Sequence, residues 1–135
     1  MTHAAILLVE DRDEDAELTV RAFRRARLEN EIVVKCDGYE ALEYLETSSP
    51  PAMVLVDINM PRMNGIRLLE RIRQIDRLRS VPVIMLTSSL EERDLIACYD
   101  RGASSYLRKP VARADFAELI AHLGMHWMVL NKRPA

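Results

Sequence analysis

Short apolar runs alternate with longer amphipathic segments along most of the chain. Five apolar runs are typical of buried strands, and they cover residues 4–9, 32–34, 53–56, 83–86 and 105–107. Between and after these runs, apolar residues recur at helical spacing, as at Ala16, Val20 and Phe23. Strands that alternate regularly with helices predict an α/β fold, with a five-stranded parallel sheet and five helices that cover both of its faces.

Turn signals place the boundaries of these segments. Asp37-Gly38 closes the second strand, and a stretch rich in serine and proline at 47–51 ends the helix that follows. The next helix is predicted after Gly65, with an inner face made by Leu68, Leu69, Ile72 and Ile75. The apolar stripe of the last helix comprises Phe116, Leu119, Ile120, Leu123, Trp127 and Leu130.

The composition narrows the class of protein. Hydrophobic residues make up 49% of the chain and charged residues 30%, as in ordinary globular domains. The net charge of −2 gives no reason to expect binding to nucleic acid or anionic lipid, and no apolar run approaches the roughly 20 residues of a membrane span. Cys36 and Cys98 are too few for a disulfide framework, which favours a reducing compartment. We therefore expect one cytoplasmic domain over residues 1–135, with no nucleic-acid or membrane partner.

Polar residues with matching chemistry follow four of the predicted strands. Glu10 and Asp11 follow the first strand, Asp57 the third, Thr87 the fourth and Lys109 the fifth. Parallel strands deliver their carboxyl ends to one edge of a sheet, where open α/β folds bind ligands. Three carboxylates repel one another unless a cation or protons offset them, and an all-oxygen cluster favours Mg²⁺. The lysine and the hydroxyl suit an anion with several oxygens, so the pattern favours phosphoryl transfer with a carboxylate as the nucleophile.

Each of these residues alone is more typical of a loop, a helix cap or a solvated surface charge, and only their joint placement favours a site. In order and in spacing they resemble the receiver domain of two-component response regulators. The matching residues are Glu10-Asp11, Asp57 followed by Met60-Pro61 and Gly65, Thr87, and Lys109-Pro110. The resemblance covers essentially the whole chain and implies a flavodoxin-like receiver fold, similar to single-domain chemotaxis regulators.

The resemblance implies that Asp57 is a phosphoacceptor that receives a phosphoryl group from a phosphohistidine on a sensor histidine kinase. It also implies that Mg²⁺ is the cofactor. Asp11, Asp57 and the backbone carbonyl of Asn59 would hold the ion directly, and Glu10 would act mainly through water. Glu10 stands where aspartate is commoner in the family.

Further residues have switching roles by the same resemblance. Lys109 would pair with the phosphoryl oxygens, and Thr87 would donate a hydrogen bond to one of them. Tyr106 stands where the family has an aromatic residue that moves inward with the hydroxyl group. The peptide bond before Pro110 would be cis. Ser88 stands where a smaller residue is usual, and we expect it to alter the lifetime of the phosphorylated state.

The C-terminal segment 113–135 is apolar nearly all round. Met125, Met128 and Val129 lie off the stripe that continues through Trp127 and Leu130. Two interpretations stay open, a tail packed against its own domain and a homodimer contact through the last helix, and a methionine-rich face suits the latter. We expect no output domain after Ala135, and therefore signalling through a partner surface. The first helix, segment 37–42 and the tail also resemble regulators paired with phytochrome-type kinases.

Other functions fit the residues less well. A pseudo-receiver, which keeps the fold without phosphoryl transfer, would lack an acid or the lysine, and here none is missing. A phosphatase with an aspartyl nucleophile would need a second aspartate where Asn59 stands. A flavin-binding protein would need a phosphate-cradling first loop, and Glu10-Asp11 would repel phosphate. We therefore expect a phosphoacceptor switch that catalyses only its own phosphorylation and dephosphorylation, and not an enzyme with a separate substrate.

Overall fold

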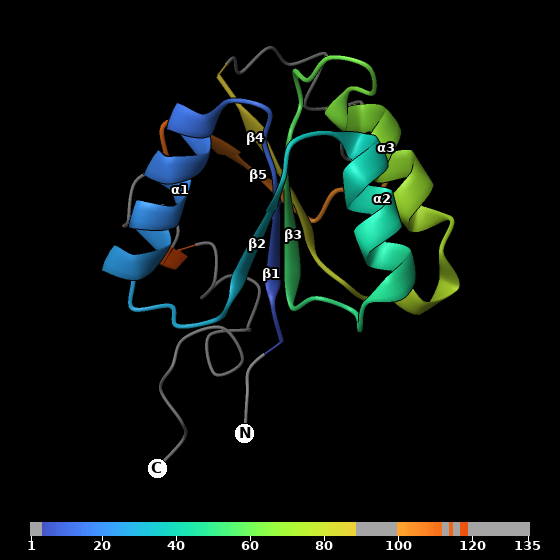
Figure 1. The fold of residues 1–135 in the computed structure, drawn as a ribbon, viewed down its shortest axis with the longest axis horizontal. Helices are drawn as coiled ribbons and strands as arrows, with labels where there is room; N and C mark the ends of the chain where they lie inside the picture. The colour runs from blue at the N-terminus through green and yellow to red at the C-terminus, as the bar shows by residue number, and fades with distance from the viewer. Residues whose placement is uncertain (1–3, 89–99, 112–113, 115–116, 119–135) are drawn as a thin grey trace.

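The computed structural model describes residues 4–88, 100–111, 114 and 117–118. In chain order the elements are β1 (Ile6–Val9), α1 (Asp13–Arg25), β2 (Ile32–Lys35), α2 (Gly38–Thr47), β3 (Met53–Asp57), α3 (Gly65–Arg73), the 3-10 helix η1 (Asp76–Leu78), β4 (Val83–Thr87) and β5 (Ser105–Arg108). The strands form one parallel sheet in the order β2-β1-β3-β4-β5, with α1 on one face and α2 and α3 on the other (Figure 1). The predicted five-stranded parallel sheet is confirmed. Nearly all of the fourth and of the fifth predicted helix lies outside the described residues.

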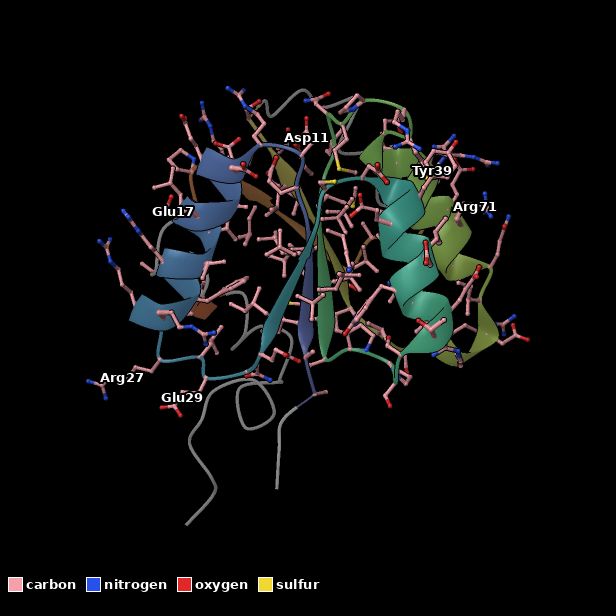
Figure 2. All side chains as sticks on the ribbon, in the orientation of Figure 1. Asp11, Glu17, Arg27, Glu29, Tyr39 and Arg71 are labelled. Atoms are coloured by element: carbon pink, nitrogen blue, oxygen red, sulfur yellow. The ribbon has the colours of Figure 1, made fainter. Side chains whose placement is uncertain are left out.

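Two apolar clusters, one on each face of the sheet, form the core. Ile6 and Leu8 of β1 belong to the cluster that contains Phe23 of α1. Leu7 of β1 belongs to the other cluster, together with Leu69 of α3. Successive side chains of a strand point to opposite faces, so a strand covered on both sides must be apolar at every position, and it reads as an unbroken apolar run. Charged side chains extend outward from the surface in Figure 2, among them Glu17, Arg27 and Glu29.

Helix α3 ends earlier than its apolar spacing predicts. Ile75 lies beyond the last helical residue, Arg73, but it still packs against the core cluster on that face. The guanidinium group of Arg73 donates hydrogen bonds to the carbonyls of Gly102 (2.8 Å) and Val81 (2.9 Å). This side chain therefore ties the end of α3 to the segments that lead into β4 and β5. Within the described part of the chain, no helix combines the length and apolar character needed to cross a membrane.

The register of the sheet brings the polar strand ends to one edge. β1 and β3 are paired up to their last apolar positions, so Glu10 and Asp57 emerge beside each other. β4 and β5 are paired so that Thr87 lies opposite Arg108, the residue before Lys109. The chain crosses from one side of β1 to the other between β2 and β3, which makes the edge between β1 and β3 a topological switch point. Open α/β sheets place their ligand sites at such a point.

Candidate phosphoacceptor and metal site

Three carboxylates meet at the carboxyl ends of β1 and β3. Glu10, Asp11 and Asp57 each offer an oxygen, and these oxygens all lie within 4.8 Å of one another. Glu10 and Asp57 are each only 2% exposed. Figure 2 shows Asp11 at the end of β1, where the chain turns toward α1. The acidic residues that the sequence analysis selected are therefore brought together.

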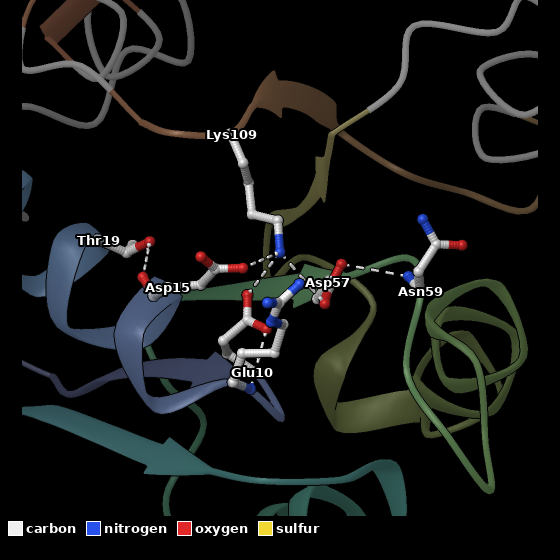
Figure 3. Close-up of polar contacts among 7 residues, drawn as sticks. Glu10, Asp15, Thr19, Asp57, Asn59 and Lys109 are labelled. Carbon is white, nitrogen blue, oxygen red and sulfur yellow. Dashed lines mark hydrogen bonds and ion pairs between the residues drawn. The ribbon is translucent and has the colours of Figure 1, made fainter.

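Lys109 reaches into this acidic cluster from the end of β5 (Figure 3). Its Nζ lies 3.0 Å from an oxygen of Glu10, 2.8 Å from Asp15 and 3.3 Å from Asp57. Burial alone would lower the pKa of Lys109. The hydrogen bonds to Asp15 and Glu10 and the charge of Asp57 more than offset burial, and the pKa lies above its ordinary value. The ammonium group therefore stays charged and offsets part of the negative charge of the cluster.

The carboxyl group of Glu10 is buried beside another carboxylate, and this changes its pKa. Burial, and then the negative charge of Asp57, raise its pKa from an ordinary 4.5 to about 7, although Lys109 acts in the opposite direction. Near neutral pH, Glu10 therefore competes for a proton. A divalent cation that bound here would displace this proton, because metal ligands must be deprotonated.

The donor set fits a hard divalent cation. All of the side-chain donors are carboxylate oxygens, the ligand type that Mg²⁺ prefers. The Oδ1 atom of Asp11 is buried and has no hydrogen-bond partner among the described residues, so it is available to bind a ligand. Asn59 follows Asp57 in the same loop, and its backbone N–H donates to Asp57 Oδ1 at 3.2 Å. The loop is thus held against the carboxylate that the sequence analysis identified as the nucleophile.

Gly65 makes the close approach of α3 to Asp57 possible. A Cβ atom at this position would lie 2.3 Å from the backbone oxygen of Asp57 and 2.8 Å from the Cα atom of Ile58. The amide of Gly65 instead donates to the carbonyl of Ile58 at 2.8 Å. Between them, Arg62 adopts a left-handed conformation with φ of 68°, and its side chain pairs with the buried Asp37 at 2.7 Å. These contacts fix the loop that follows the phosphoacceptor candidate.

Three of the residues expected to switch, Thr87, Ser88 and Pro110, lie at the same edge of the sheet. Thr87 is buried at the end of β4, and its carbonyl accepts a hydrogen bond from the Lys109 amide at 2.8 Å. Ser88 follows it and is exposed, and with Lys109 and Pro110 it lines a cavity of about 340 Å³. The Lys109–Pro110 peptide bond is cis, as expected. Tyr106 is half-buried and packs against the apolar cluster on the α2–α3 face.

Asp15 contacts the site but was not predicted from the sequence. It lies in the first turn of α1 and makes the shortest of the three contacts of Lys109 Nζ. In the sequence, Asp13, Glu14 and Asp15 all look like first-turn acids that favour the helix dipole. Only the three-dimensional fold shows which of them faces the lysine.

Comparison with known proteins finds a matching family model and similar regulatory proteins. The family model "Response regulator receiver domain" matches residues 6–121. The chain is 37% identical over 134 residues to the probable methanogenesis regulatory protein FilR2 of Methanothrix harundinacea, with 96% of this chain and 86% of FilR2 covered. It is 31% identical over 136 residues to response regulator Rcp1 of Synechocystis sp., with 96% of this chain and 92% of Rcp1 covered.

Solved structures of response regulators are also similar to this chain. The bacteriophytochrome response regulator AtBRR superposes with a TM-score of 0.85 and 41% identity, covering 98% of this chain and 100% of its own. The Mn²⁺-bound form of Rcp1 gives a TM-score of 0.74 and 30% identity, covering 98% and 99%. The phosphorylated cyanobacterial phytochrome response regulator RcpA gives 0.78 and 28% identity, covering 99% and 100%.

Proposed function

Because the chain belongs to the response regulator receiver domain family, we propose that Asp57 accepts a phosphoryl group from a sensor histidine kinase in a Mg²⁺-dependent reaction. One observation carries the proposal: the buried Asp57 carboxylate lies between the Lys109 ammonium group at 3.3 Å and two further acids. A pseudo-receiver without phosphoryl transfer remains the alternative. The complete set of acids and the lysine, gathered at one sheet edge, favours the phosphoacceptor.

The proposed reaction exchanges one bond to phosphorus for another. An oxygen of Asp57 attacks the phosphorus atom of a phosphohistidine as the phosphorus–nitrogen bond breaks. The imidazole leaves with the electron pair and takes up a proton, and Asp57 becomes a mixed anhydride, an aspartyl phosphate. Lys109 offsets charge on the transferred oxygens. The chain would act as a phosphoacceptor switch and would catalyse only its own modification and its reversal.

Asp11, Asp57 and the backbone carbonyl of Asn59 would hold Mg²⁺ directly, and Glu10 would hold it mainly through water. When bound, the ion would offset the negative charge of the carboxylates and of the phosphoryl oxygens. The unpartnered, buried Oδ1 atom of Asp11 and the all-oxygen donor set support this assignment. Rcp1 was solved in a Mn²⁺-bound form, which also supports a divalent ion as the cofactor.

Residues of the neighbouring strands β4 and β5 would respond to the phosphoryl group. Thr87 would donate its hydroxyl to a phosphoryl oxygen, because it ends β4 beside the acceptor strand. Tyr106 of β5 would then move with it. Ser88 and Pro110, which line the cavity beside Lys109, would tune the lifetime of the modified state and the contact with the kinase.

The partners follow from the relatives. AtBRR and RcpA are named as phytochrome response regulators, so we place a phytochrome-type histidine kinase first among candidate donors. We also propose that residues 1–135 form a single cytoplasmic receiver domain and that segment 113–135 joins two copies through the last helix. Output would pass through a protein surface, not through nucleic acid or membrane.

A phosphorus–nitrogen donor tests the reaction without knowledge of the kinase. The protein is incubated with phosphoramidate and Mg²⁺, and ³¹P NMR reports any acyl phosphate. We expect a protein-bound signal for the wild type and for the exposed control Asp76→Asn, and none for Asp57→Asn. A stable acyl phosphate on Asp57→Asn would overturn the assignment of the phosphoacceptor.

A further inference from the structure

Lys109 is held by carboxylates from three different elements. Glu10 follows β1, Asp57 ends β3, and Asp15 belongs to α1. The shortest distance is to Asp15, at 2.8 Å, compared with 3.0 Å to Glu10 and 3.3 Å to Asp57 (Figure 3). The closest carboxylate to the ammonium group therefore belongs to a residue that is neither the proposed phosphoacceptor nor a proposed metal ligand.

Asp15 stands outside the group that a metal would neutralise. The oxygens that lie within 4.8 Å of one another belong to Glu10, Asp11 and Asp57. A divalent cation on those three groups would weaken their attraction for the ammonium group of Lys109. The charge of Asp15 would keep its full effect on Lys109, because it belongs to the neighbouring helix and not to the cluster.

The backbone of α1 fixes Asp15 in place. Ala16 and Thr19 are buried, and the Thr19 hydroxyl donates to the backbone carbonyl of Asp15 at 3.0 Å. The Lys109 side chain is only 12% exposed, so water screens the pair weakly. The Asp15 side chain is 28% exposed, so the ion pair is partly buried and differs from a fully exposed surface contact.

We propose that Asp15 is a positioning residue that competes with the phosphoryl oxygens for the ammonium group of Lys109, and so weakens the phosphorylated state. The inference rests on the proposed phosphoacceptor function. An ammonium group has three N–H donors, and Glu10 and Asp15 already accept hydrogen bonds from it. A phosphoryl group on Asp57 adds negative charge and further hydrogen-bond acceptors. The nearby carboxylate of Asp15 repels this charge. Asp15 thus opposes both the pairing of Lys109 with phosphate and the charge of the phosphate itself.

A simple ordering role for Asp15 predicts the opposite result. If Asp15 only kept Lys109 from swinging into solvent, its removal would weaken the binding of a phosphoryl group. Competition predicts tighter binding after the same change. The sign of the effect therefore separates the two roles, and a general structural defect would not produce a gain.

The probe is beryllofluoride, which mimics a phosphoryl group on a carboxylate, titrated at saturating Mg²⁺ and followed by ¹⁹F NMR. Asp15→Asn should bind it about tenfold more tightly, which corresponds to about 1.4 kcal/mol. Asp13→Asn makes the same chemical change at an exposed position of the same helical turn, and it should match the wild type. Asp15→Glu keeps the charge and should also stay near the wild type.

Unchanged or weaker binding by Asp15→Asn, or an equal gain in Asp13→Asn, would overturn the competition while leaving the phosphoacceptor function standing. A wild type that binds no beryllofluoride at all would overturn the proposed function, and the inference with it.

Discussion

At the scale of single residues, four carboxylates and one ammonium group gather at the carboxyl edge of the sheet. Glu10, Asp11 and Asp57 lie close enough to share an ion, and Asp15 holds Lys109 from the side of α1. The burial of Glu10 and the charge of Asp57 keep Glu10 protonated up to about neutral pH. This arrangement disfavours the fully ionised, metal-free site, and a divalent cation relieves that cost.

The stability of the metal-free protein should fall as the pH rises through the titration of Glu10. The pKa of Glu10 is about 7 in the folded chain and 4.5 ordinarily, so the folded state binds the proton more tightly and loses relative stability between these values. Glu10→Gln cannot ionise. We expect it to be more stable than the wild type by up to about 3 kcal/mol at about pH 8, and to match it below about pH 4.

Urea unfolding with EDTA at the two pH values measures this difference. The matched control is Glu17→Gln, an exposed position on α1, which should show no such dependence. A wild type that is more stable than Glu10→Gln at the higher pH would contradict the raised pKa.

Lys109→Ala should separate modification from switching. The nucleophile Asp57 stays in place, so the variant should still form the acyl phosphate. The charge that pairs with the phosphoryl oxygens is lost, so phosphorylation should not change the conformation of Thr87 and Tyr106. Amide NMR spectra of the modified proteins measure this, and shift changes at those two residues equal to those of the wild type would contradict the role of Lys109.

At the scale of elements, the packing of α3 against β3 depends on Gly65. Gly65→Ala places a Cβ atom 2.3 Å from the backbone oxygen of Asp57, and backbone cannot move aside cheaply. We expect a loss of about 2–3 kcal/mol in the free energy of unfolding and weaker Mg²⁺ binding. Gly38→Ala is the matched control, because its Cβ would meet the flexible end of Met63 at 2.7 Å, and it should cost less. Urea unfolding compares the two, and an equal or smaller loss for Gly65→Ala would contradict this account.

The elements differ in how far the sequence could predict them. β1, β3 and β4 are unbroken apolar runs with every residue buried, so their positions and their polar ends follow from the pattern. The end of α3 does not follow from the pattern, because Ile75 keeps the helical spacing although the helix has already ended. The end of the helix is held by Arg73, whose guanidinium group donates hydrogen bonds to the carbonyls of Val81 and Gly102.

The candidate site divides in the same way. The acids and the lysine at the strand ends follow from parallel topology, because each strand delivers its last residue to the same edge. Asp15 could not be chosen from its neighbours Asp13 and Glu14 by residue type. Its contact joins positions 94 residues apart, and long-range contacts of this kind are set by tertiary packing.

At the scale of the whole molecule, the apolar C-terminal segment should control association. Removal of the residues after Leu123 deletes the second apolar face of Met125, Met128 and Val129 and should weaken any dimer. A chain that ends at Asn131 keeps this face and is the matched control. Sedimentation velocity compares the three lengths, and an unchanged profile after the longer truncation would favour a tail packed within its own domain.

The central claim is that the acidic edge of the sheet makes Asp57 a Mg²⁺-dependent phosphoacceptor, and intact mass tests it most directly. The wild type and Asp57→Asn are incubated with acetyl phosphate, with and without Mg²⁺. We predict that the wild type gains one phosphoryl group only with Mg²⁺, that hydroxylamine removes it, and that Asp57→Asn gains none. An unmodified wild type under every condition, or an equal adduct on Asp57→Asn, would contradict the claim.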